Sequence, residues 1–312
     1  MKPATSPKPV LLVALGGNAL IRKGQTGTAS QQLENLKVPA RQIARLASDY
    51  RIIITHGNGP QVGNLMLQQE CCDTVERMPL EILVAQTQGQ IGYMIESTLD
   101  EAFMERGINT QPLVSLISYV VIDEQDPSFH TPSKPIGPAF EREKALTLPY
   151  PVVETPKGFR RVVVSPKPVT IVEKREIKTL IEKDFIVICC GGGGIPVVRK
   201  GRTFDGVDAV IDKDLASARL AEEVGVDLFV IATDVQGVAL DFGKPAERFL
   251  DTVSLDEISR HMLKDQFSAG AMLPKVEAAM QFVSSGGGEA VITHIQSLEA
   301  AVRGEAGTRF VP

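Results

Sequence analysis

Short runs of apolar residues alternate along the chain with segments in which apolar residues recur every three or four positions. Apolar runs without polar alternation predict strands that are buried on both faces. We expect these strands at residues 10–15, 51–55, 110–118, 185–190, 227–232 and 290–293. We expect helices at residues 28–48, 60–70, 81–106, 177–183, 213–224, 254–263 and 274–284, followed by a short last helix. Strands separated by helices predict an α/β fold with a mostly parallel sheet.

One segment, between Asp123 and Val169, interrupts this alternation. It holds nine prolines, at positions 127, 132, 135, 138, 149, 151, 156, 166 and 168. So many prolines exclude a long helix and disfavour central strands. A linker would explain the prolines, but Phe129, Ile136, Phe140, Phe159 and the run RRVVV add apolar mass. We therefore expect a small unit that packs on the main body as a mobile lid.

Composition excludes several classes of protein. The 312 residues carry a formal net charge of −5, which gives no general basic surface for nucleic acid. No apolar run approaches the roughly 20 residues that span a membrane. The run VLLVAL near the start is too short for a signal peptide and no small-residue cleavage site follows it, so we expect a disordered tail at 1–9 and then a strand.

The four cysteines form two adjacent pairs, Cys71-Cys72 and Cys189-Cys190. Neither a CxxC motif nor the His/Cys spacing of a metal site is present. We expect buried, reduced thiols and a cytoplasmic protein.

Three predicted strands end in glycine-rich turns, VALGGNAL (13–20), ITHGNGPQVGN (54–64) and CCGGGGIPV (189–197). Ligands bind at the carboxyl ends of strands in open parallel sheets, so three such turns are expected to meet at one crevice. Three purely structural turns remain the alternative. The four glycines at 191–194 fit either a tight turn or close approach to a phosphate. Under the second interpretation, valine at Gly192 or Gly193 would abolish binding of the phosphate ligand more than stability.

Two lysines are predicted in the first turns of helices. Asp212 is a natural N-cap before Lys213, and Pro274 suits the first helical position before Lys275. Cations at these positions oppose the helix dipole, and a bound polyphosphate would reverse that cost. We therefore expect Lys275→Ala to lower turnover a hundredfold or more without destabilising the ligand-free fold. Asp214 either caps the same helix or holds the two ammonium groups.

The strings LGGNAL, HGNGPQVG, SKPIGP, RRVVVSPKP, GGGGIPV, VIDKDLAS and MLPKVEAA, in this order, resemble the carbamate kinases of the amino acid kinase superfamily. The resemblance implies an open αβα sandwich with a mostly parallel sheet and a small protruding subdomain at about 123–169. Within one domain at 10–312, it implies a carbamate and carbamoyl phosphate half (10–184) and a nucleotide half (185–312). The implied activity is reversible phosphoryl transfer between ATP and carbamate with Mg²⁺, run toward ATP synthesis in the fermentative breakdown of arginine or related compounds. The resemblance also implies a homodimer.

The resemblance assigns site residues position by position. It makes Lys134 the substrate-side lysine, Lys213 and Lys275 the ATP-phosphate lysines, and Asp214 the aspartate that organises them. The carbamate and the transferred phosphoryl group would be surrounded by Gly16, Gly17, Asn18, Gly57, Asn58 and Gly59. ATP would also contact Gly192, Gly193, Asp234 and Lys244. No protein ligand for the metal and no general base is implied, because the carbamate oxygen is already ionised.

Two departures and three alternatives accompany this interpretation. The family's Asn-Pro-Thr-Lys reads His130-Thr131-Pro132-Ser133-Lys134 here, and its Thr-Asn-Val reads Thr233-Asp234-Val235.

A kinase of the same superfamily acting on glutamate, acetylglutamate, aspartate or UMP is the first alternative, and the proline-rich insertion argues against it. A non-catalytic nucleotide or metabolite sensor is the second, and the retained lysines oppose it. An NAD-dependent dehydrogenase is the third, and it lacks a complete GxGxxG fingerprint. His56 is expected near the site without a role in proton transfer.

Overall fold

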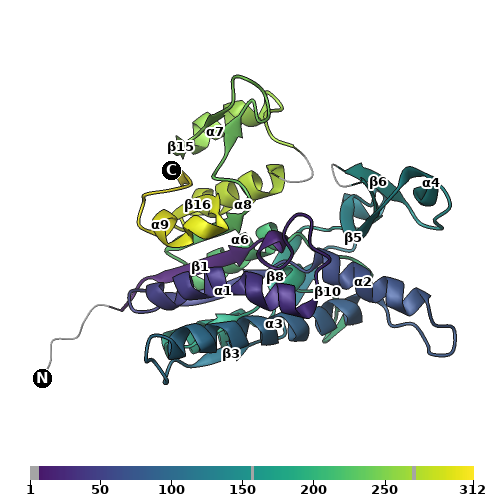
Figure 1. The fold of residues 1–312 in the computed structure, drawn as a ribbon, viewed down its shortest axis with the longest axis horizontal. Helices are drawn as coiled ribbons and strands as arrows, with labels where there is room; N and C mark the ends of the chain where they lie inside the picture. Colours follow the sequence, from purple (N-terminus) through teal and green to yellow (C-terminus); the bar gives the residue numbers. More distant parts are fainter. Residues whose placement is uncertain (1–6, 156–157, 269–271) are drawn as a thin grey trace, which may run out of the picture.

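A mostly parallel sheet runs through the middle of the molecule, with helices on both of its faces (Figure 1). The computed structural model describes residues 7–155, 158–268 and 272–312. Within them the main sheet has eight strands in the order β15-β17-β16-β12-β1-β2-β9-β3, and the pairs at its centre are parallel. The strands are β1 Val10–Leu15, β2 Arg51–His56, β3 Leu113–Ser115, β9 Ile186–Ile188, β12 Leu228–Thr233, β15 Thr252–Ser254, β16 Glu289–His294 and β17 Thr308–Val311. The αβα fold class is confirmed.

Strand β1 is buried on both faces, as its apolar run predicts. Leu12 packs into a core with α5, α6 and α8, whereas Leu11 and Val13 pack into a second core with α1, α3 and α9. The two cores are the two interfaces of the sandwich. The helices are α1 Ala29–Leu46, α2 Gly59–Glu70, α3 Leu80–Met104, α4 Arg142–Ala145, α5 Lys174–Glu182, α6 Lys213–Val224, α7 Leu255–Met262, α8 Leu273–Ser284 and α9 Leu298–Val302.

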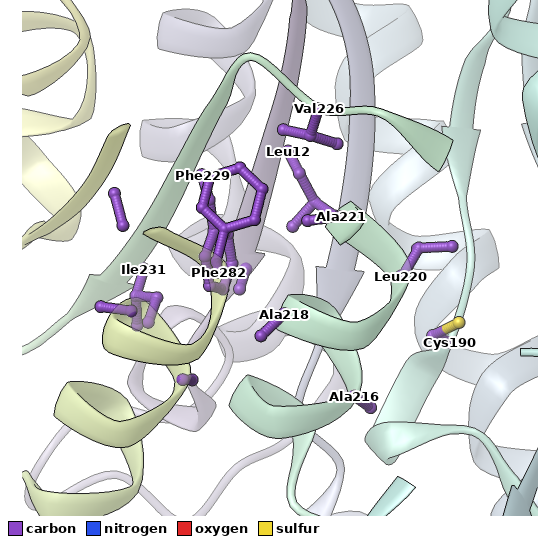
Figure 2. Packing of buried hydrophobic residues seen from close by; sticks show 14 of the residues in the cluster. Leu12, Cys190, Ala216, Ala218, Leu220, Ala221, Val226, Phe229, Ile231 and Phe282 are labelled. Atoms are coloured by element: carbon purple, nitrogen blue, oxygen red, sulfur yellow. The ribbon is translucent and has the colours of Figure 1, made fainter. Parts of the chain in front are cut away.

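The core beneath α6 and α8 fixes how these two helices lie (Figure 2). Phe229 of β12 and Phe282 of α8 are fully buried and meet edge to face, with ring centroids 5.6 Å apart. Ala218 and Ala221 of α6 are small and fully buried in the same cluster, where small side chains let a helix lie close to its neighbours. Burying each phenylalanine stabilises the fold by roughly 2–3 kcal/mol. This packing sets the positions of the first turns of α6 and α8, where Lys213 and Lys275 lie.

The proline-rich segment forms a separate three-stranded antiparallel sheet that projects beside α2 (Figure 1). Its order is β5-β7-β6, so the strand with two prolines, β5 Lys134–Phe140, is at an edge. The central strand β7 Gly158–Val163 contains none, and β6 Val152–Thr155 is the other edge. The proline-containing strand β5 is at an edge as expected, but the expectation against central strands in this segment is wrong for β7, which contains no proline.

The described part of the proline-rich segment at 123–169, here called the excursion, is packed on the main body. Ile136 is fully buried against a cluster that includes Val62 of α2. Gly63 of α2 lies directly against Gly137, and a Cβ added at Gly63 would collide with the Gly137 backbone. The excursion's attachment through apolar contacts agrees with the sequence prediction.

A second sheet was not predicted. It has the order β11-β10-β4-β8, formed by β4 Tyr119–Ile122, β8 Pro168–Ile171, β10 Ile195–Lys200 and β11 Thr203–Gly206. Two-residue strands β13 Ala239–Leu240 and β14 Arg248–Phe249 form a hairpin. The strand expected at 110–118 is wrong in length, because only Leu113–Ser115 pairs with β9.

The expectation of four buried thiols is half correct. Cys189 and Cys190 are buried between the sheet and α6, but Cys71 is exposed and Cys72 is half-buried at the end of α2. Two adjacent cysteines therefore do not by themselves indicate burial, because Cys71 and Cys72 directly follow the last turn of α2. No helix among the described residues has both the length and the apolar character needed to cross a membrane. The tail at 1–6 lies outside the described residues.

Candidate active site

The three glycine-rich turns follow the adjacent strands β1, β2 and β9, and they meet. A Cβ added at Gly57 would lie 3.6 Å from the Gly17 nitrogen and 3.4 Å from Cδ of Lys213, so these segments are in contact. They surround a cavity of about 180 Å³ at the carboxyl ends of the strands. The cavity is lined by Gly17, Gly57, Asn58, Gly59, Pro60, Lys134, Pro135, Arg160, Gly192, Val210, Ile211, Asp212, Lys213 and Asp214. The predicted convergence on one crevice is confirmed.

The four consecutive glycines have packing reasons of their own. Gly192, Gly193 and Gly194 have φ values of +68°, +92° and +84°, which side-chain-bearing residues rarely adopt. A Cβ at Gly192 would meet the Asn58 amide, and one at Gly193 would meet the Ile211 carbonyl group. Valine at Gly192 or Gly193 should therefore also lower stability, and the expectation that ATP binding falls more than stability stays a prediction. Contact of these glycines with ATP stays a prediction.

Asp212 caps α6 and also binds a lysine from the excursion. Its Oδ1 accepts hydrogen bonds from the backbone nitrogens of Asp214, at 2.8 Å, and Leu215, at 3.4 Å. Its Oδ2 accepts a hydrogen bond from Nζ of Lys134. Burial alone would raise the pKa of Asp212, but Lys134 and then Lys275 and Lys213 hold it well below its ordinary value. Asp212 therefore links Lys134 of the excursion to the first turn of α6.

Asp214 bridges the two predicted lysines. Nζ of Lys213 donates to its Oδ1, and Nζ of Lys275 donates to its Oδ2 at 3.0 Å. The capping role belongs to Asp212, so of the two interpretations of Asp214 the structure shows the second. Helix α8 begins at Leu273, one residue before Pro274, and Lys275 remains in its first turn. The helix dipoles predict an anion beside Lys213 and Lys275, and in the structure the carboxylate of Asp214 takes that position.

The three ionisable groups differ in how burial affects them. Burial lowers the pKa of Lys213 below its ordinary value, although Asp214 opposes the shift. Burial also acts to lower the pKa of Lys275, but Asp214 and Asp212 outweigh it and raise that pKa. Burial would raise the pKa of Asp214, whereas Lys213 and Lys275 lower it. Both lysines are thus available as cations that a single carboxylate keeps in place.

A second cleft, of about 300 Å³, adjoins this ion-paired group. It is lined by Thr233, Asp234, Val235, Ala239, Asp241, Phe242, Lys244, Asp265, Gln266, Phe267, Ser268, Met272 and Lys275. Lys275 lines this cleft while its partner Asp214 lines the first, so the Lys275–Asp214 pair lies where the two meet. Lys244 pairs at the rim with Asp241, at 3.0 Å. The mixture of apolar and charged lining residues suits a nucleotide.

The structure brings most of the predicted site residues to these two clefts, with three exceptions. Gly16, Asn18 and Gly193 are not among the lining residues, and Gly16 instead packs against β12, its nitrogen 2.9 Å from the Ala232 oxygen. His56 is buried behind the cavity, where burial lowers its pKa to about 4. It lies against Gly191, which places it in the packing of the turn.

Sequence reasoning does not predict two charged residues of the cavity, Asp212 and Arg160. The sequence indicates Asp212 only as a helix cap and Arg160 only as part of an apolar-rich run. Three cationic side chains, Lys134, Lys213 and Arg160, line the cavity together with the carboxylates of Asp212 and Asp214, which leaves an excess of one positive charge. Lys275 adds a further cation where the two clefts meet. Such a site favours an anion. No group of three or more His, Cys, Asp or Glu side chains in the described part of the chain could hold a metal ion.

Comparisons with known proteins agree with this geometry. The model of the amino acid kinase family matches residues 9–294. The carbamate kinase of Thermococcus kodakarensis is 45% identical over 96% of this chain and 98% of its own. The carbamate kinase-like protein YahI of Escherichia coli is 42% identical over 97% and 99%. The structure of Giardia lamblia carbamate kinase bound to AMP-PNP superposes with a TM-score of 0.90, at 36% identity, over 98% of this chain and 99% of that one. The chain belongs to the amino acid kinase family, and within it to the carbamate kinases.

Proposed function

We propose that the protein transfers a phosphoryl group reversibly between carbamoyl phosphate and ADP, giving carbamate and ATP. The observation that carries this proposal is the bridge Lys275–Asp214–Lys213, which joins the nucleotide-sized cleft to the small cationic cavity. The AMP-PNP complex of the Giardia enzyme supports a nucleotide in the larger cleft, because that structure shares the fold over nearly its whole length.

The chemistry needs charge and position more than proton transfer. An oxygen of the ADP β-phosphate attacks phosphorus, the bond from phosphorus to the carbamate oxygen breaks, and carbamate leaves as an anion. Two anions must approach each other for this step. Lys213 and Lys275 neutralise that repulsion, and the backbone of the glycine turns fixes the small substrate. Because both the nucleophile and the leaving group are ionised, no general base is required.

Magnesium fits as a companion of the nucleotide. Both oxygens of Asp214 are bound by lysines, and both oxygens of Asp212 accept hydrogen bonds, so neither carboxylate is free to build a dedicated cage. Mg²⁺ commonly binds through substrate phosphates and water. Bound with ADP or ATP, it would neutralise phosphate charge.

The charge of the first cavity favours a small anionic substrate. Lys134, Lys213 and Arg160 line it, and Lys275 lies where it meets the nucleotide cleft. Carbamoyl phosphate is a compact dianion that suits these cations.

The metabolic setting follows from the resemblance alone. We expect the reaction to run toward ATP in the cytoplasm, during fermentative breakdown of arginine or a related compound. We also expect a homodimer, which light scattering of the purified protein would test. The excursion is expected to move as a lid, and slower hydrogen exchange across 123–169 with ADP and a carbamoyl phosphate analogue bound would support that motion.

The function can be tested with purified protein and a coupled assay. ATP formed from ADP and carbamoyl phosphate is measured through hexokinase and glucose-6-phosphate dehydrogenase. Parallel reactions offer ATP with glutamate, acetylglutamate, aspartate or UMP. We expect turnover of carbamoyl phosphate with ADP. The rates of ATP with glutamate, acetylglutamate, aspartate and UMP should each be at least a hundredfold lower. Preferred turnover of another acceptor would reject the proposal.

A further inference from the structure

Arg160 contributes a cation to the small cavity and differs from the lysines around it. It lies on β7 of the excursion, half-buried, and its Nε donates a hydrogen bond to the Gly137 oxygen at 3.0 Å. Among residues 7–155, 158–268 and 272–312, no carboxylate forms an ion pair with it. Burial accordingly lowers the pKa of Arg160, with no neighbouring anion to raise it again.

Each neighbouring cation is paired with a carboxylate, which Arg160 is not. Lys134 pairs with Asp212, and Lys213 and Lys275 share Asp214. Arg161, the next residue of β7, pairs with Glu70 at 2.6 Å and stacks over the Tyr150 ring at 4.1 Å. Removing a cation from water without an anion costs free energy. Arg160 bears that cost at the wall of a cavity, where an anionic ligand would offset it.

The position of Arg160 indicates which part of the substrate it meets. Lys275 reaches the nucleotide cleft and Lys213 adjoins it through Asp214, so the transferred phosphoryl group belongs between these lysines. Arg160 enters the same cavity from the excursion, together with Pro135 and Lys134. It therefore faces the end of the substrate that is remote from the nucleotide.

We propose that Arg160 binds the carbamoyl end of carbamoyl phosphate and, in the reverse direction, the carboxylate of carbamate. This inference rests on the proposed function. A guanidinium group presents parallel N–H donors that match two oxygens on one carbon, whereas an ammonium group is a point charge. Arg160 thereby selects a planar carboxyl-type acceptor and orients its oxygen toward phosphorus.

Two adjacent arginines allow a matched experiment. Arg160→Gln and Arg160→Lys are compared with Arg161→Gln in the full-length protein. Arg160→Gln is expected to lower kcat/KM for carbamoyl phosphate about 100-fold, the size typical of a lost charge-stabilising donor. The KM of Arg160→Gln for ADP should stay within twofold of wild type. The kcat/KM of Arg160→Lys for carbamoyl phosphate should be about tenfold higher than that of Arg160→Gln. Arg161→Gln should change the KM for carbamoyl phosphate less than threefold.

Inorganic phosphate, used as a competitive inhibitor, separates the two ends of the substrate. Its inhibition constant should change less than twofold in Arg160→Gln, because the lysines hold the phosphate end. An inhibition constant that rises as much as the KM for carbamoyl phosphate would overturn the assignment. So would normal carbamoyl phosphate kinetics in Arg160→Gln.

Thermal unfolding without ligand supplies a readout that does not depend on activity. Arg160→Gln should melt at the wild-type temperature or higher, because an uncompensated charge is removed. Arg161→Gln should melt lower, because it loses Glu70 and Tyr150. A lower melting temperature for Arg160→Gln would assign the residue to stability and overturn the inference. A wild-type enzyme that forms no ATP from carbamoyl phosphate would instead reject the proposed function.

Discussion

Lys213 and Lys275 bind opposite oxygens of Asp214, although the two lysines come from different helices. The carboxylate is 2% exposed, so it has little water to replace either partner. One buried anion therefore sets the spacing of two cations that are expected to contact the phosphates. Loss of any member should disturb the other two.

Asp214→Asn should lower both stability and turnover. It removes the carboxylate that pairs directly with two buried ammonium groups, a change that typically costs about 3–5 kcal/mol. Turnover should fall by roughly 10²–10³ because the lysines lose their fixed positions. Urea unfolding and the coupled assay measure the two effects. Asp205→Asn is the matched control, because Asp205 pairs with Lys200 at the exposed surface and should cost less than about 1 kcal/mol. Equal costs in the two variants would contradict the account.

Lys275→Ala should lower turnover a hundredfold or more, and it should also lower the melting temperature. From the helix dipole alone we expect no loss of stability, but the ion pair with Asp214 reverses that expectation. Differential scanning calorimetry of the ligand-free protein decides between the two. A melting temperature equal to or above that of wild type would show that the pair contributes nothing.

The alkaline limb of the pH profile should belong to Lys213. Burial lowers its pKa below the ordinary 10.5, so it loses its proton before a typical lysine does as pH rises. Because the charged form is the active one, kcat/KM for carbamoyl phosphate should fall as pH increases through that pKa. Lys213→Arg should show a lower rate, and its alkaline limb should move to higher pH. An unchanged limb in this variant would assign the titration to another group.

His56 should make the fold sensitive to mild acid. Its pKa is about 4 in the folded protein and about 6.5 when unfolded, so the unfolded chain binds more protons between these values. Its contribution is complete above pH 6.5 and is lost as pH falls toward 4, by up to about 3 kcal/mol. The free energy of unfolding of His56→Gln should depend less on pH over this range. A slope in His56→Gln equal to that of wild type would exclude His56 as the cause.

Gly193→Ala should destabilise the fold through packing as well as backbone strain. Gly24 provides the control, because its φ is +82° but a Cβ there meets nothing within 4 Å. Gly24→Ala should cost about 1 kcal/mol, whereas Gly193→Ala adds a collision with the Ile211 carbonyl group and should cost at least about 2 kcal/mol more. Chemical denaturation compares them. Equal costs would mean that the turn can move away from Ile211.

The sequence predicts the main fold well where local signals are strong. Helix α6 begins and ends at the predicted residues, because Asp212 caps it and Gly225 adopts φ +76° after its last turn. The second sheet is not predicted because β4 has only four residues and β10 contains Pro196, which usually argues against an interior strand. Periodicity gives no signal for such strands.

The sequence predicts most residues of the candidate site and the role of Asp214 between the two lysines, but it does not predict the contact between Lys134 and Asp212. Lys134 and Asp212 are 78 positions apart, and no local pattern indicates that they meet. Arg160 and Arg161 are adjacent and chemically identical, but successive strand residues point to opposite faces. Only the fold shows that one faces the cavity and the other pairs with Glu70.

The central claim is phosphoryl transfer from carbamoyl phosphate to ADP, and ³¹P NMR of the reaction follows it most directly. With ADP, Mg²⁺ and wild-type enzyme, the carbamoyl phosphate signal should decline while the ATP γ-phosphate signal grows in equal amount. Asp214→Asn should slow both changes together. Decay of carbamoyl phosphate into inorganic phosphate without ATP, or no enzyme-dependent change at all, would contradict the account.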